Sequence, residues 1–207
     1  MDLEDFRAAV RTRIGANAND TFHTNARLNE QINSAVETFS SEYRWPWLID
    51  TATVTITSGS TSVPVPADWA YTLSLVINGA HRQALWPAAL TDIDRLTLET
   101  GMPTVYADAG DNLVVAPTPD GGYTATMRYF RVENVLSDNA HEPLAPDRYA
   151  AVIVAYAAYL ALASENRVDE AQIAVSEYQG RVTRLAKQVN RQGRPTAARV
   201  RPGHGWG

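Results

Sequence analysis

The sequence predicts an α+β fold in which a helical bundle, built from both ends of the chain, carries an inserted antiparallel β domain. Apolar residues recur every three or four positions near each terminus, which indicates helices with one buried face. Between them the period falls to two, and turn-forming residues separate short segments, which indicates antiparallel strands. The expected parts are N-terminal helices in 1–47, a β domain with one short helix in 48–142, C-terminal helices in 143–190 and an extended basic tail in 191–207.

The composition limits the classes of function. The chain has 207 residues and no cysteine, which excludes disulfides, thiolate nucleophiles and zinc–thiolate sites. Residues 181–207 contain seven basic residues and no acidic one, which leaves 11 basic and 23 acidic residues, a net charge of −12, in the first 180. The longest apolar run, 149–163, is shorter than the roughly 20 residues of a membrane helix, so no membrane association is expected.

Two helices are expected before residue 48. The first covers 2–14, and the second begins at a cap formed by Thr24 or Asn25 and continues to about Tyr43. Pro46 then ends helical structure, because proline disfavours the α conformation of the residue before it.

Strands are expected from Thr51 onward. Residues 51–57 and 61–66 form a predicted hairpin around the turn at 58–60, and Pro64 and Pro66 place its second strand at a sheet edge. A second hairpin is predicted in 73–86, because Asn78-Gly79 is a strong turn signal. Strands at 104–108, 112–116 and 123–130 complete a seven-stranded, largely antiparallel sheet.

Helices are expected inside and after this sheet. Thr91 and Asp94 have capping-box spacing and Gly101 is a C-terminal stop, which predicts a short helix over 91–101. After Pro146, the helix at 149–163 is apolar on every side, so it must be surrounded, and packing against neighbouring copies is a natural supplement. Asn166 and Asp169 separate it from a last helix that ends near Asn190.

Motifs for catalysis or metal binding are missing from the sequence. The histidines His23, His81, His141 and His204 have no ligand spacing, and "DAGDN" at 108–112 fits a hairpin turn better than a calcium loop. No phosphate-binding glycine motif or nucleophile elbow occurs. We therefore expect no metal, no cofactor and no enzymatic activity.

Four tryptophans lie at predicted element boundaries, and they allow two interpretations. Exposed rings would stack on sugars, whereas buried rings would fill the joint between the helices and the β domain. Each tryptophan adjoins proline or an apolar neighbour, which favours the structural role. The predicted elbow, which also serves subunit packing, consists of Tyr43, Trp45, Pro46, Trp47 and Trp69.

The arrangement resembles the head-to-tail adaptor proteins of tailed bacteriophages, also called head-completion or connector proteins. The resemblance rests on "YRWPWLID" after the second helix, a Thr/Val hairpin closing on "VPVPADW", and "YFRVENVLSDNAHEPLAPDRYAAVIVAYAAYLA" leading from strand to helix. A long helix and a basic tail follow, so the resemblance covers nearly the whole chain.

The resemblance implies a structural virion protein of the phage neck, assembled in the host cytoplasm. It implies a ring of twelve copies that binds the portal protein and the next neck or tail protein, and through which DNA passes without sequence-specific contacts. In such adaptors the C-terminal segment docks on the portal, a role that maps here onto Arg191, Arg194, Arg199, Val200, Arg201 and Trp206.

Two other functions are left open by the residues alone. A carbohydrate-binding module or a tail-spike-like hydrolase would use exposed Trp47, Trp69 or Trp86. A nucleic-acid binder would use the arginine tail, but basic residues without interleaved aromatics beside an acidic body disfavour it.

Overall fold

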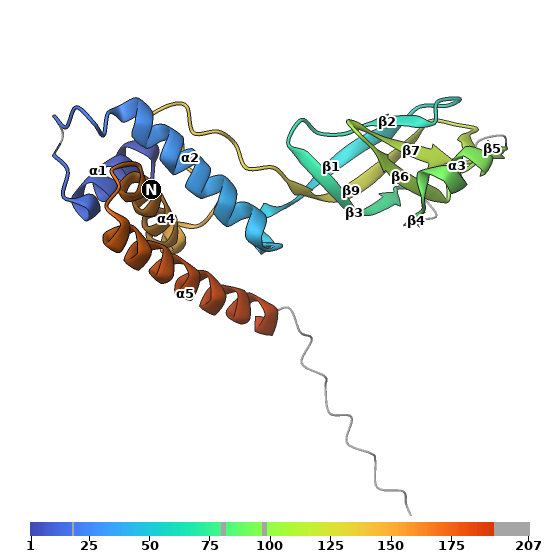
Figure 1. Cartoon of the computed structure of the whole chain (residues 1–207). Helices are drawn as coiled ribbons and strands as arrows, with labels where there is room; N and C mark the ends of the chain where they lie inside the picture. The colour runs from blue at the N-terminus through green and yellow to red at the C-terminus, as the bar shows by residue number, and fades with distance from the viewer. Residues whose placement is uncertain (18, 80–81, 97–98, 193–207) are drawn as a thin grey trace, which may run out of the picture.

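The protein is elongated, with helices gathered at one end and strands at the other (Figure 1). The computed structural model describes residues 1–192 except 18, 80–81 and 97–98. The described residues form five α-helices and a seven-stranded, mostly antiparallel sheet, which confirms the α+β class. We call α1, α2, α4 and α5 the helical body, and the strands with α3 the β body.

The first two helices follow from local signals. Helix α1 spans Leu3–Ile14, and the Asp2 side chain caps it by accepting a hydrogen bond from the backbone N–H of Asp5 at 2.8 Å. Helix α2 spans Asn25–Glu42, and Thr24 caps it in the same way through the N–H of Arg27 at 3.3 Å. Both caps satisfy donors that a helix N-terminus otherwise leaves unpaired.

Helix α4 lies at the centre of the helical body. A 3-10 turn at Asp147–Tyr149, preceded by Pro146, leads into α4 at Ala150–Ser164, and nine of the fifteen α4 residues are buried. Helices α1, α2 and α5 all pack on α4. One chain therefore covers most of this apolar helix, so its burial does not depend on neighbouring copies.

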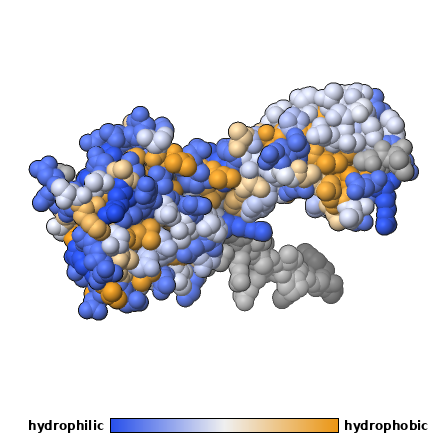
Figure 2. Space-filling model, turned by 45° about the horizontal axis from the view of Figure 1, so that its top comes forward, coloured by the Kyte–Doolittle hydropathy of each residue, from blue (hydrophilic) through white to orange (hydrophobic). Residues whose placement is uncertain are grey.

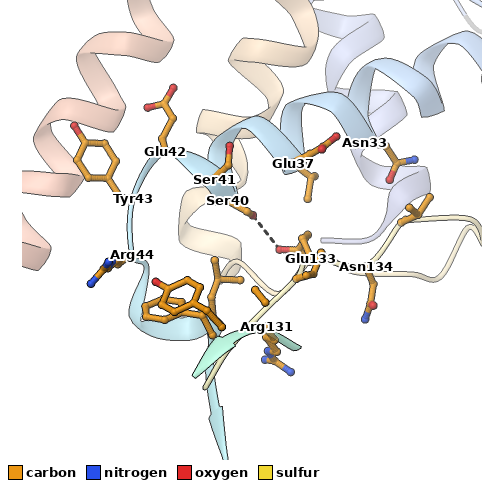
Figure 3. Close-up of a pocket in the computed structure, with 17 residues that line it drawn as sticks. Asn33, Glu37, Ser40, Ser41, Glu42, Tyr43, Arg44, Arg131, Glu133 and Asn134 are labelled. Carbon is orange, nitrogen blue, oxygen red and sulfur yellow. Dashed lines mark hydrogen bonds between the residues drawn. The ribbon is translucent and has the colours of Figure 1, made fainter. Parts of the chain in front are cut away.

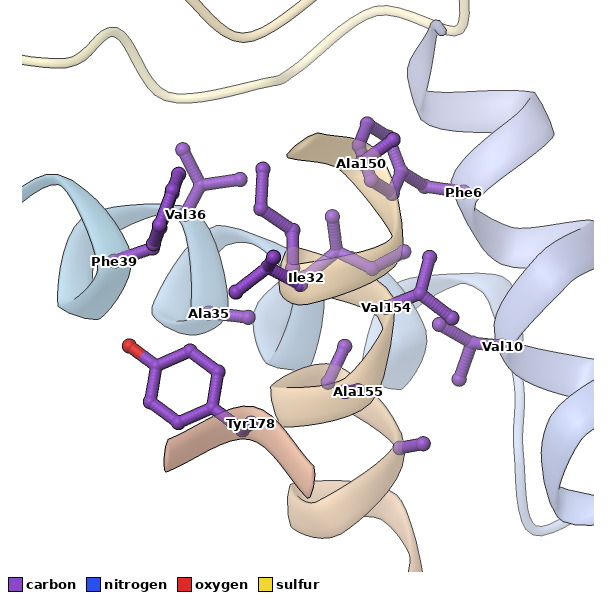
Figure 4. Packing of buried hydrophobic residues seen from close by; sticks show 14 of the residues in the cluster. Phe6, Val10, Ile32, Ala35, Val36, Phe39, Ala150, Val154, Ala155 and Tyr178 are labelled. Atoms are coloured by element: carbon purple, nitrogen blue, oxygen red, sulfur yellow. The ribbon is translucent and has the colours of Figure 1, made fainter. Parts of the chain in front are cut away.

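The core of the helical body draws on all four of its helices (Figure 4). Phe6 and Val10 come from α1, Ile32 and Phe39 from α2, and they meet the small side chains of α4. The alanines on α4 let the neighbouring backbones approach closely, because their side chains are small.

Helix α5 spans Val168–Gln192, two residues beyond the predicted end. Asn166, with φ of 59°, supplies the left-handed turn between α4 and α5. Tyr178 on α5 is 2% exposed and donates a hydrogen bond to Glu42 Oε1 at 2.9 Å, which joins α5 to the end of α2.

The sheet has the strand order β1-β9-β3-β4-β6-β7-β2. Neighbours are antiparallel except β4 and β6, which are parallel. A separate parallel pair joins β5 to β8. The strands are β1 Ile49–Ile56, β2 Ser62–Pro64, β3 Trp69–Ile77, β4 Gln83–Pro87, β5 Thr100–Gly101, β6 Val105–Ala109, β7 Asn112–Ala116, β8 Thr118–Pro119 and β9 Tyr123–Arg131.

The predicted hairpin of 51–57 with 61–66 is wrong, although its turn exists. Strand β1 pairs along its whole length with β9, and β2 pairs with β7 at the opposite edge of the sheet. Residues 49–56 find eight partners in β9, whereas Pro64 shortens β2 by removing a ladder donor. The predicted edge position of the strand that contains Pro64, β2, is confirmed. β1 and β2 lie at opposite edges of the sheet but still contact each other, because the sheet curls.

Other local predictions in the β body have mixed outcomes. β3 and β4 pair on either side of Asn78-Gly79, and β6 and β7 pair around "DAGDN", where Gly110 has φ of 66°. The predicted helix 91–101 is shorter, because α3 covers only Leu90–Leu96 and Gly101 belongs to β5. Thr91 thus lies inside the helix instead of capping it. Gly101, the expected C-terminal stop, pairs with β8 as part of a strand.

The segment between β9 and the 3-10 turn runs back along the helical body. Leu136 is 2% exposed within the helical core, and its backbone exchanges two hydrogen bonds with the Asn33 side chain at 2.7 and 3.1 Å. The N–H of Leu3 donates to the carbonyl of His141 at 3.0 Å. Residues 132–146 therefore attach mainly to the helices.

Candidate interaction surfaces

The neck between the two bodies is built from aromatic side chains. Trp45 is fully buried, stacks on Trp47 with ring centres 4.8 Å apart, and donates from Nε1 to the carbonyl of Phe39 at 2.6 Å. Trp47 also meets Tyr149 at 4.9 Å, and Tyr43 meets Trp45 at 5.3 Å. This cluster fixes the path of the chain as it leaves α2.

Two predicted elbow residues differ from the others in position. Pro46 opens a 3-10 turn, Pro46–Leu48, that leads into β1. Trp69 lies at the start of β3, packs on the core of the β body and donates to Thr72 Oγ1 at 3.1 Å. The structure thus brings Tyr43, Trp45 and Trp47 together and leaves Trp69 outside their cluster.

Polar contacts reinforce the neck on the side of β9. Arg131 binds Asp50 Oδ2 at 3.2 Å and the carbonyl of Trp47 at 3.4 Å. The Arg44 guanidinium lies over the Tyr71 ring, 5.5 Å from its centre. The Arg131 contacts join the two chain segments that cross between the bodies, and the Arg44 contact joins the first of these segments to β3.

A cleft of about 900 Å³ lies beside the neck (Figure 3). Its walls come from the second half of α2, from β3, and from β9 with the residues after it. Val132 and Val135 at its edge are 54% and 72% exposed. Figure 2 shows hydrophobic surface near the junction of the two bodies, as well as on the β body. The lining includes Asn33, Glu37, Ser40, Tyr43, Tyr71 and Glu133.

Glu133 is the carboxylate held most firmly in this cleft. Its Oε2 accepts from the Ser40 hydroxyl at 3.1 Å and its Oε1 from the Leu144 N–H at 2.8 Å. Burial raises the pKa of Glu133 above its ordinary value, and these hydrogen bonds oppose the rise only in part.

A second hollow, of about 360 Å³, lies where α5 passes the start of α4 and has a basic lining. Arg181 forms an ion pair with Glu177 Oε1 at 2.7 Å. The Arg148 guanidinium lies over the Tyr149 ring, 4.8 Å from its centre. Neither Arg148 nor Arg184 has an ion-pair partner among the residues that the structure describes. We call this the basic hollow, formed by Arg148, Tyr149, Val152, Arg181, Arg184, Leu185 and Gln188.

Sequence reasoning missed both the cleft and the basic hollow. The helical spacing of Arg181 and Arg184 was a usable signal, because residues three apart share a helix face. Arg148, 33 positions earlier, had no such signal. Among the tail residues, Arg191 belongs to α5, whereas Arg194, Arg199, Val200, Arg201 and Trp206 lie outside the described residues.

The three tryptophans that a carbohydrate-binding module would use differ in accessibility. Trp86 on β4 is 71% exposed, whereas Trp47 and Trp69 are half-buried. Among the described residues no three His, Asp or Glu side chains gather in a metal-binding group. None of the described helices combines the length and apolarity required to cross a membrane.

The protein thus consists of two bodies with separate cores, a cleft beside the neck that joins them, and a basic hollow on the helical body. The model of the SU10 adaptor protein family matches residues 1–203, and the chain belongs to this family of bacteriophage head-to-tail adaptors. Members are structural components of the virion that associate with portal and tail proteins and with copies of themselves. None of the curated proteins compared matches the chain.

Proposed function

We propose that this protein forms a ring of about twelve copies between the portal and the next component of the tail, extending the channel through which DNA passes. The observation that carries the proposal is the family match over 1–203, which includes both bodies and most of the basic tail. The protein acts as a connector without catalysis, and it joins the virion in the host cytoplasm.

The proposed division of labour follows the two bodies. Helices from 1–47 and 143–190 pack around α4, and the β body projects from them. Residues 132–142, predicted as part of the β domain in 48–142, return along the helices instead. The stacked Trp45 and Trp47 fix the angle between them, because buried aromatic stacking leaves little freedom at the neck. The ring therefore presents two distinct faces, one helical and one made of strands.

The basic tail is the proposed contact with the portal. Arginines of 191–207 pair with portal carboxylates, and Trp206 fills a pocket there. Ordering such a segment costs conformational entropy, which these contacts offset. Several tails on one ring raise the effective concentration of each remaining tail, so the assembled ring binds far more tightly than one copy.

The charge distribution supports a DNA channel in the same ring. The first 180 residues carry a net charge of −12, and a wall of this sign does not retain phosphates as basic residues would. DNA would therefore slide through the proposed ring without sequence-specific contacts.

Native mass spectrometry of the protein mixed with its portal ring tests this proposal. A matched chain ending at Gln192 keeps all of α5 and lacks residues 193–207 of the tail. We expect about twelve full-length copies to bind each portal and the shortened chain to bind at least about tenfold more weakly. If the full-length chain does not bind the portal, the proposed function is wrong. If both chains bind the portal equally well, only the proposed role of the tail is wrong.

A second candidate function rests on Trp86. Its ring is 71% exposed on β4, and an exposed indole is a stacking platform for sugars. Oligosaccharides that change the tryptophan fluorescence of the wild type but not of Trp86→Phe would support a carbohydrate-binding β body. No change in either protein would exclude this role for Trp86.

A further inference from the structure

The basic hollow contains more positive charge than the described residues around it neutralise. Glu177 pairs with Arg181, but Arg148 and Arg184 have no carboxylate partner among the described residues. The sequence from Tyr178 to Gln192 adds Lys187 and Arg191 and contains no acidic residue. The apolar Tyr149, Val152 and Leu185 line the same hollow, so it suits a surface that offers carboxylates on a mostly uncharged background.

The outer face of α2 offers such a surface. Glu30 and Glu37 are exposed and lie two turns apart on one side of the helix, with the small Ser34 between them. Neither glutamate has an ion-pair partner in the part of the chain that the structure describes. We call Glu30, Ser34 and Glu37 the acidic face.

The two surfaces lie on different sides of the helical body. Helix α4 contacts both α2 and α5, and Figure 1 shows α2 and α5 on opposite sides of α4. Two different complementary patches on one molecule give a head-to-tail contact, which closes into a ring when the rotation between copies allows it. A self-complementary patch would instead give a twofold dimer.

We propose that the basic hollow of one copy binds the acidic face of the next copy in the ring. This inference rests on the proposed function, because it names the surfaces by which neighbouring copies meet. Arg148, Arg181 and Arg184 contact Glu30 and Glu37 of the neighbour, and the guanidinium groups bind these carboxylates in fork-like pairs.

Exposed ion pairs contribute little on their own, so the contact also needs apolar surface. Glu37 lines the inter-domain cleft, whose edge carries the exposed Val132 and Val135. On the other partner, Ile173 lies on the same helix as the arginines and is 68% exposed. A neighbouring α5 that lies along α2 covers these side chains as the charges pair.

Charge reversal tests the contact directly. One variant carries Arg181→Glu and Arg184→Glu, and the other carries Glu30→Arg and Glu37→Arg. Assembly on the portal is counted by native mass spectrometry, and circular dichroism checks that both variants are folded. Each variant alone should lose more than about tenfold in assembled copies, because like charges then face each other.

The equimolar mixture of the two variants should restore assembly. In an alternating ring, every reversed hollow meets a reversed acidic face, and every unreversed hollow meets an unreversed acidic face, so all contacts regain opposite charges. The two masses should appear in equal numbers. Arg82→Glu with Arg95→Glu, two exposed arginines of the β body, changes the net charge by as much as Arg181→Glu with Arg184→Glu and should assemble like the wild type.

Three outcomes would show whether the proposed contact or the proposed function is wrong. Normal assembly of either variant alone overturns this contact and leaves the proposed ring intact. Loss of assembly in both variants without rescue in the mixture also overturns it, because the surfaces then bind the portal or another partner. Failure of the wild type to assemble on the portal contradicts the proposed function itself.

Discussion

Trp45 is the largest fully buried side chain among the described residues, and its indole nitrogen is hydrogen-bonded as well. Trp45→Ala removes its stacking on Trp47 and leaves a cavity beside Phe39. We expect the free energy of unfolding to fall by about 3–5 kcal/mol, measured by urea denaturation. The matched control is Trp86→Ala on the exposed β4 surface, which should change this energy by less than about 0.5 kcal/mol.

Glu133 provides a prediction about pH. Its pKa is raised in the folded protein mainly by burial, so the folded state favours the protonated carboxyl. The resulting stabilisation is complete below the unfolded pKa near 4.5 and is lost as the pH rises through the folded pKa. Relative to Glu133→Gln, the wild type should therefore lose stability as the pH rises above 4.5, as measured by urea unfolding at several pH values.

Ser40 supplies the internal control for that measurement. Its hydroxyl donates to Glu133 and lowers the pKa of this carboxyl, so Ser40→Ala should raise the pKa further. The pH-dependent loss of stability should then extend to higher pH. Identical pH profiles for the wild type, Ser40→Ala and Glu133→Gln would show that the cleft does not perturb this group.

At the scale of elements, the turn between α4 and α5 depends on one left-handed residue. Asn166 has φ of 59°, a conformation that costs most side chains about 1–2 kcal/mol. Asn166→Val should lower the free energy of unfolding by about this amount, whereas Asn166→Gly should keep or slightly increase it. Equal destabilisation by both substitutions, seen in thermal or urea unfolding, would mean that the asparagine side chain itself stabilises the turn.

For the whole molecule, the two bodies should unfold as separate units. Their cores form separate clusters, and Leu113 is fully buried in the β body. Leu113→Ala should cost about 2–5 kcal/mol there and speed hydrogen exchange of the amides in β1, β7 and β9. Amides of α2 and α4 should exchange as in the wild type. Equal acceleration in both bodies would indicate one cooperative unit.

The sequence by itself determined the elements whose signals are local. Apolar spacing set α1 and α2, and the cap at Thr24 set the start of α2, because a helix satisfies its backbone within a few residues. Asn78-Gly79 set the β3–β4 pairing for a similar reason. Trp45 and Trp47 were predicted to lie at the joint and are found in the neck, whereas Trp69, predicted with them, lies in the β body.

Only the tertiary structure decided which distant segments meet. A strand can pair with any strand of suitable pattern, so the local turn after β1 did not prevent β1 from joining β9 and β2 from joining β7. Arg148 approaches Arg181 and Arg184 only because α4 packs on α5, and Glu133 reaches Ser40 only because residues 132–146 return along α2. Local sequence patterns specify backbone hydrogen bonding within an element, whereas surfaces formed by several elements depend on packing across the whole chain.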